Sequence, residues 1–71
     1  MERSTAAKIR ALRDESGLTQ EQLAVAAGLT TKTLGNAERG QVPSIGTLWK
    51  LSRYFGCTVD DLLPDEEEIA A

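Results

Sequence analysis

The sequence predicts an all-α domain built from five short helices. Apolar residues recur at intervals of three and four positions, which is the spacing of one face of an α-helix. A serine or threonine precedes each of these segments, where its hydroxyl can cap a free N–H group of the first turn. Glycines follow four of the segments, and glycine is the usual residue at a helix C-terminus. The cap positions are Ser4, Thr19, Thr30, Ser44 and Thr58, and the terminating glycines are Gly17, Gly28, Gly40 and Gly56.

The first expected helix covers residues 5–16. Ile9 and Leu12, with Ala6, form its apolar stripe. Arg13 lies beside this stripe, so we expect its side chain to be partly buried. A buried charge is costly unless it is paired. Arg13 therefore needs an acidic partner elsewhere in the chain.

Residues 19–39 predict two short helices joined by a tight turn. Thr19 and Gln22 have the spacing of a capping box, in which each side chain bonds the backbone of the other residue. Gly28 ends this helix, and Thr30 caps the next one. A helix, a glycine-containing turn and a second helix form the helix-turn-helix pattern, whose second helix can enter the major groove of DNA. Similar helix pairs also occur in all-helical domains that have no nucleic-acid role.

The second helix of this pair divides into two faces. The inward face is expected to carry Thr33, Leu34 and Ala37. The outward face is expected to carry Thr31, Lys32, Gly35 and Asn36. Glu38 lies one turn after Leu34 and therefore also faces inward. An inward glutamate and a partly buried arginine in one small domain suggest that Glu38 and Arg13 form a structural ion pair.

Residues 45–55 predict a fourth helix, which begins after Pro43 because proline disfavours helix at the preceding residue. Its expected core face comprises Ile45, Leu48, Leu51 and Phe55. Trp49 lies beside this face, where it either covers the edge of the core or contributes to a protein interface, in which tryptophan is enriched. We favour the core edge.

A short fifth helix follows. Thr58 and Asp61 have the spacing of another capping box, and Pro64 lies at the helix end. Its apolar side consists of Val59, Leu62 and Leu63. Cys57, just before this helix, is expected to be a small buried hydrophobic residue rather than a reactive thiol.

The charges are unevenly placed along the chain of 71 residues, whose net charge is −3. Up to Thr58, eight cationic residues stand against five acidic ones, a balance of +3, and the remaining six acidic residues follow. We expect one domain at residues 1–64. Residues 65–71 are expected to form a disordered acidic C-terminal tail.

The composition argues against several classes of function. No apolar run reaches the length of a membrane span, and the N-terminus has no apolar signal region, so we expect a cytoplasmic protein. The chain has no histidine and a single cysteine, which leaves no plausible metal site. It also lacks a nucleophile–base pair and a phosphate-binding glycine loop. We therefore expect no enzyme activity, no cofactor and no small-molecule substrate.

Taken as a whole, the chain resembles the lambda-repressor and Cro-like helix-turn-helix family, also called the Xre family. The matching stretches are IRALRDESGLTQEQLAVAAGLTTKTLGNAERG and PSIGTLWKLSRYFGCTVDDLL. The resemblance implies a compact five-helix, lambda-repressor-like domain with its helix-turn-helix at the second and third helices. It also implies a bacterial or phage-type, nucleoid-associated transcriptional regulator, of the repressor kind, that reads operator DNA. The alternative is a protein-interaction module that keeps this fold without binding DNA specifically.

The resemblance also implies roles for individual residues. Base edges are expected to meet Thr31, Lys32 and Asn36, and the DNA backbone is expected to meet Gln20, Thr30, Arg39 and Gln41. The Arg13–Glu38 pair is one that such domains often carry. Gly35 departs from the family pattern, because glycine inside a helix costs roughly 1 kcal/mol relative to alanine. It either permits close backbone approach or reflects weak selection.

Family members bind as dimers, and the resemblance implies the same here. We expect a weak homodimer, completed on a palindromic site in double-stranded DNA. The surface available for it comprises Trp49, Arg53, Tyr54, Val59 and Leu63. The surface is small, whereas stable interfaces bury about 800 Å² on each partner.

Overall fold

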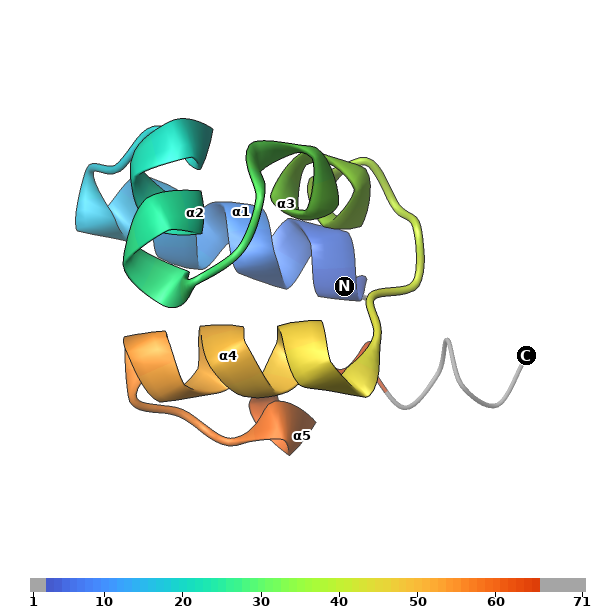
Figure 1. Cartoon of the computed structure of the whole chain (residues 1–71). Helices are drawn as coiled ribbons and strands as arrows, with labels where there is room; N and C mark the ends of the chain where they lie inside the picture. Colours follow the sequence, from blue (N-terminus) through green and yellow to red (C-terminus); the bar gives the residue numbers. More distant parts are fainter. Residues whose placement is uncertain (1–2, 66–71) are drawn as a thin grey trace.

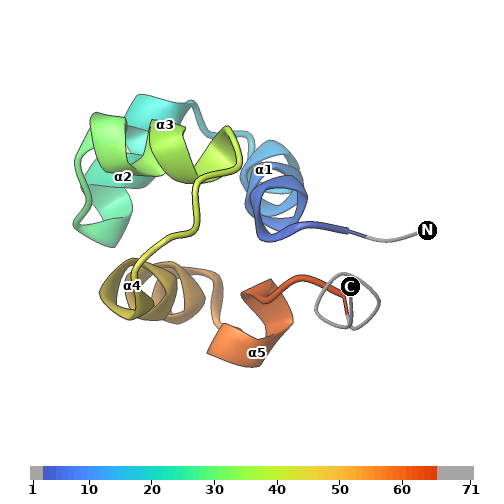
Figure 2. The same ribbon diagram turned by 90° about the vertical axis from the view of Figure 1, so that its right-hand side faces the viewer.

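The computed structural model describes residues 3–65, which fold into five α-helices. They are α1 (Thr5–Ser16), α2 (Gln20–Ala27), α3 (Thr31–Glu38), α4 (Ile45–Phe55) and α5 (Val59–Leu62). Figure 1 shows α4 crossing the molecule with α5 on one side of it and α1, α2 and α3 on the other. Figure 2, turned by 90°, again places α3 and α5 on opposite sides of the molecule. The all-α fold with five helices is therefore confirmed.

The helix starts confirm every predicted cap. In each helix the hydroxyl of the cap residue accepts a hydrogen bond from the backbone N–H three residues later. Both predicted capping boxes, Thr19 with Gln22 and Thr58 with Asp61, are complete. Asp61 is an exposed carboxylate whose pKa is lowered by the backbone and side-chain hydrogen bonds with Thr58. Local side-chain chemistry thus sets where these helices begin.

The helix ends follow the glycine prediction with one difference. Gly28 has φ +79° and its N–H donates to the end of α2, so the turn between α2 and α3 uses the left-handed conformation that glycine adopts without strain. Helix α3 ends differently: Arg39, at φ −91°, is its cap residue, and Gly40, at φ +106°, comes one residue later. The difference matters because it fixes the Arg39 backbone to the end of α3.

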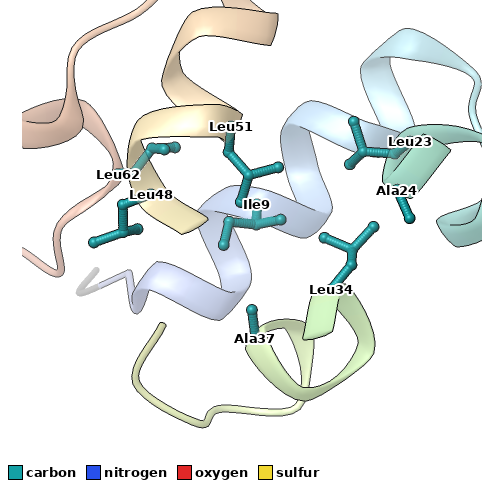
Figure 3. Close-up of a cluster of buried hydrophobic side chains, with 8 residues drawn as sticks. All are labelled: Ile9, Leu23, Ala24, Leu34, Ala37, Leu48, Leu51 and Leu62. Atoms are coloured by element: carbon teal, nitrogen blue, oxygen red, sulfur yellow. The ribbon is translucent and has the colours of Figure 1, made fainter. Parts of the chain in front are cut away.

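The core consists of aliphatic side chains that come from all five helices. Figure 3 shows them pointing toward one another: Ile9, Leu23, Ala24, Leu34, Ala37, Leu48, Leu51 and Leu62. Five of them are fully buried, and each fully buried leucine or isoleucine contributes about 1.5–3 kcal/mol relative to an exposed one. Leu34 and Ala37 tie α3 to this core, as predicted.

Two predictions for α4 are wrong. Ile45 was expected in the core, but it is 71% exposed. It has the spacing of the core face, but it is the first residue of α4 and is not among the residues that pack against the core. Trp49 was favoured at the core edge, but it is 52% exposed and lies outside the core cluster, with the Arg53 guanidinium 4.8 Å from its ring centroid.

The two ends of the described chain meet. The backbone N–H of Asp65 donates to the Arg3 carbonyl at 3.0 Å, and the Arg3 N–H donates to the Asp65 carboxylate at 2.6 Å. Lys8 pairs with the same carboxylate at 3.1 Å and donates to the Leu63 carbonyl. The hydrogen bond with Lys8, followed by that with Arg3, lowers the pKa of Asp65. Asp65, expected in the tail, thus contacts the helical body, and residues 66–71 lie outside the described residues.

None of the helices within residues 3–65 combines the length and the apolar character needed to cross a bilayer.

Candidate nucleic-acid interface

The residues predicted to meet DNA lie at one end of α2, along α3 and in the loop after it. Thr31 and Lys32 are exposed in the first turn of α3, and Arg39 and Gln41 are exposed just after its end. Asn36 and Gln20 are half-buried. The first-turn N–H groups of a helix have no partner within it, so α3 also presents donors that suit phosphate.

Helix α3 is held in place by an ion pair with α1. Arg13 Nε donates to Glu38 Oε2 at 2.8 Å and Arg13 Nη2 donates to Glu38 Oε1 at 2.9 Å. The Glu38 side chain is 2% exposed and that of Arg13 is 19% exposed, which confirms the predicted buried pair. The hydrogen bond with Glu38 raises the pKa of Arg13 despite the opposing effect of burial. Such bidentate pairs fix orientation as well as distance.

Two more contacts strengthen this attachment. Arg10 Nη1 donates to the Glu38 backbone carbonyl at 2.7 Å, which satisfies an acceptor that α3 itself leaves open at its C-terminus. Arg13 Nη1 donates to the Leu18 carbonyl at 3.0 Å in the turn before α2. One side of α1 therefore holds the end of α3 and the turn that leads into α2.

Gln20 has a partner that the sequence pattern does not reveal. Its Nε2 donates to Glu38 Oε1 at 3.2 Å, so its side chain joins the ion pair from the start of α2. Only the three-dimensional approach of α2 and α3 shows this contact. A contact between the Gln20 side chain and the DNA backbone would have to use the amide N–H that does not bond Glu38.

Gly35 lies on the outer side of α3, as predicted. It is nevertheless buried, because the side chains of Arg39 and Gln20 cover it. Arg39 in turn donates from Nη2 to the Asn36 side-chain oxygen. The structure therefore brings Gln20, Gly35, Asn36 and Arg39 together in one cluster, which their sequence spacing only partly suggests.

The charges exposed along this segment are both positive. Lys32 and Arg39 are exposed, whereas Glu38 is buried and paired with Arg13. Thr30 is occupied as the cap: its hydroxyl accepts from the Thr33 N–H at 3.1 Å and donates to the Thr33 hydroxyl at 2.9 Å. From residue 30 to residue 41, the accessible side chains are therefore polar or cationic, which suits a polyanion.

The surface expected to support a dimer is only partly accessible. Trp49, Arg53 and Tyr54 are exposed, with Arg53 stacked over the Trp49 ring. Val59 and Leu63 instead pack partly against the core. Cys57 also packs there partly buried, and its pKa is raised by desolvation, which agrees with its expected role as a small hydrophobic residue.

Comparison with known proteins gives consistent matches. A model of a helix-turn-helix family matches residues 9–62. An uncharacterized HTH-type transcriptional regulator of Archaeoglobus fulgidus is 36% identical over 64 residues, which cover 87% of this chain and 91% of that protein. The HTH-type transcriptional regulator DdrOP3 of Deinococcus deserti is 41% identical over 61 residues, which cover 84% of this chain and 47% of DdrOP3.

Among solved structures, the P22 c2 repressor in complex with a synthetic operator is similar, with a TM-score of 0.78 and 27% identity. That superposition covers 86% of this chain and 94% of the P22 chain.

Proposed function

We propose that this chain, which belongs to the helix-turn-helix family, represses transcription by reading operator DNA with α3 in the major groove. Family membership makes it a DNA-binding transcription regulator. The observation that supports the groove-reading role is the rigid placement of α3. The Arg13–Glu38 pair and the buried Leu34 and Ala37 hold its inner face, while Thr31 and Lys32 are free on its outer face. This action belongs to the cytoplasm, where the chain would associate with the nucleoid.

The residues divide into two groups by the chemistry they offer. Thr31, Lys32 and Asn36 would meet base edges: a Thr methyl can contact a thymine methyl, and Lys and Asn side chains can hydrogen-bond purine edges. Gln20, Thr30, Arg39 and Gln41 surround them and would meet sugar and phosphate groups. Such backbone contacts fix the register of the protein on the duplex, and base contacts then provide specificity.

A single copy of α3 reads only a few base pairs, so we also propose that two copies bind a palindromic site. Helix-turn-helix dimers place their recognition helices about 34 Å apart, one helical turn of DNA. The exposed Trp49, Arg53 and Tyr54 would form the contact between copies. This surface is small, so the dimer would be weak in solution and completed on DNA.

Selection of bound duplexes from a random pool tests the proposal directly. We expect a palindromic consensus whose half-sites are separated by about one helical turn. Binding should also weaken steeply with salt, because phosphate neutralisation releases counterions. A pool that shows no enrichment, together with binding that does not depend on salt, would refute DNA binding.

The alternative is a protein-interaction module, and the net charge of −3 together with the exposed Trp49 and Tyr54 favours it. Under this alternative, α3 would not read base sequence, and the selected pool would show no consensus. The same selection experiment therefore decides between the two functions.

A further inference from the structure

Gly35 lies in the middle of α3, and two side chains from other positions occupy the space beside it. We propose that Arg39, besides its proposed contact with the DNA backbone, positions Asn36: seated on Gly35, it orients the Asn36 amide, and the two side chains then read one base together. We name Gly35, Asn36 and Arg39 the Gly35 cluster; Gln20 borders it. The proposal deepens the DNA-reading function proposed above and rests on it.

The contact between Arg39 and Gly35 is close. A Cβ atom added to Gly35 would lie 3.1 Å from Arg39 Nη1 and 3.9 Å from Arg39 Cζ. It would also lie 3.7 Å from Gln20 Oε1. The guanidinium therefore rests against the backbone of α3 so closely that a Cβ atom at residue 35 would force it to shift. Glycine, although costly in a helix, permits this close approach.

Arg39 is fixed at both ends of its side chain. Its backbone N–H donates to the carbonyls of Gly35 and Asn36, at 3.1 and 3.2 Å, as the cap of α3. At the other end, Nη2 donates to Asn36 Oδ1. Gln20 borders the same space and is itself held by Glu38. The buried ion pair thus extends, through Gln20, to the edge of the cluster that faces outward.

The hydrogen bond from Arg39 sets what Asn36 can offer to a base. A free asparagine amide presents one acceptor oxygen and one donor NH2 group. Here the oxygen is turned to Arg39, so the NH2 group is the part left to contact DNA. The guanidinium has only donors. Together they form a donor surface, which fits guanine, because O6 and N7 of guanine are both acceptors in the major groove. Adenine places its N6 donor there and fits less well.

Two glycine substitutions separate this role from helix stability. Gly35→Ala places a methyl group 3.1 Å from Arg39 Nη1, which is closer than ordinary contact, so the exposed Arg39 side chain must shift, and it can do so without disturbing the core. Gly46→Ala is the matched control: it lies in α4, and its added Cβ would only reach ordinary contact with Ser44 Oγ at 3.8 Å. Both changes favour helix. We therefore expect neither variant to unfold at a lower temperature than the original chain.

The first measurement uses the free protein. Asn36 is the only asparagine in the sequence, so loss of its side-chain NH2 resonances in Asn36→Ala assigns them in a ¹⁵N–¹H spectrum. Arg39→Ala and Gly35→Ala should both shift these resonances, and Gly46→Ala should not. If Arg39→Ala and Gly35→Ala leave them where they are in the original chain, the proposal is overturned, whatever the chain does with DNA.

The second measurement is base preference, taken from selection out of a random duplex pool. The position whose preference is lost in Asn36→Ala should favour guanine in the original chain, by about 5- to 150-fold, the range for a specific base contact. Arg39→Ala and Gly35→Ala should reduce the same preference, and the Asn36→Ala/Arg39→Ala double variant should reduce it no further.

Two outcomes would overturn the base-reading part. One is that Arg39→Ala weakens binding to all DNA sequences equally and leaves the base preference intact. Arg39 would then contact phosphate only. The other is a preference for adenine at that position. If the pool shows no DNA binding, the proposed function fails and base reading fails with it, whereas the resonances still decide whether Arg39 orients Asn36.

Discussion

Arg13 and Glu38, twenty-five residues apart in sequence, form a bidentate ion pair with N···O distances of 2.8 and 2.9 Å. Glu38 lies on the inner side of α3, and its carboxylate is almost completely buried. In the same carboxylate, Oε1 also accepts from Gln20. The pair therefore joins three helices, and its removal should affect the placement of α3 more than the loss of any single surface contact.

Breaking this pair on one side should destabilise the domain more than replacing both partners. We expect Arg13→Met alone to cost about 3 kcal/mol, because it leaves the Glu38 carboxylate buried without its cationic partner. Glu38→Met should cost less, because Arg13 is only partly buried and keeps its contact with the Leu18 carbonyl. The Arg13→Met/Glu38→Met double variant should be more stable than the sum of the two losses predicts. Urea unfolding of the original chain, the two single variants and the double variant gives the four free energies of unfolding. Strictly additive losses would count against a coupled pair.

Lys32 should contribute to base preference rather than to general affinity. We expect Lys32→Ala to lower binding to the selected operator by about 1–3 kcal/mol and to lower binding to an operator changed at the contacted base much less. Lys50→Ala is the control, because it removes the same charge from α4. The Lys50 Nζ lies outside the proposed base contacts and donates to the Gly28 carbonyl. Fluorescence anisotropy at constant salt measures both. An equal loss of binding on every DNA sequence would show that Lys32 contacts the DNA backbone rather than a base.

Acid should loosen the C-terminal part of the domain through Asp61 and Asp65. The folded state lowers the pKa of both groups, so it favours their charged forms. Their contribution is present above the ordinary aspartate pKa of about 3.9 and is lost as the pH falls through the lower folded values. Asp61 is exposed and Asp65 is only partly buried, so the contribution is modest.

The double variant Asp61→Asn/Asp65→Asn tests this pH dependence. Its thermal midpoint should fall less between pH 6 and pH 3 than that of the original chain, so the two curves approach each other in acid. Asp60→Asn is a neighbouring control, since within residues 3–65 the Asp60 side chain caps no helix and forms no ion pair. Parallel curves for the double variant and the original chain would contradict the assignment.

The free chain should be mostly monomeric at micromolar concentration and should bind a palindromic operator as two copies. Sedimentation velocity tests both statements. Trp49→Ser should weaken binding to the full operator but not to a half-site, because only the full site brings two copies together. A tight dimer without DNA would contradict the weak-dimer proposal, and a one-to-one complex on the full palindrome would contradict pairing on DNA.

Local chemistry explains why the helix boundaries could be predicted. Caps such as Thr19 and Thr30 act within three residues, so the sequence contains both partners. Ile45 was misplaced because helical spacing indicates a face but not how far the neighbouring helices extend along it. Gly35 is covered by Arg39, which the spacing of four residues could suggest, and by Gln20, which comes from a different helix and which no local pattern could indicate. The individual DNA contacts remain predictions.

The meeting of Arg3 and Asp65 has a consequence for the rate at which the domain unfolds. This contact spans 62 residues, whereas each helix cap spans three. Closing so long a loop is favourable only after the helices are placed, so the contact should be absent from the folding transition state. Removing it with Asp65→Ala would then speed unfolding and leave the folding rate nearly unchanged. The contact between Arg3 and Asp65 would thus lengthen the lifetime of the native state without changing how quickly that state forms.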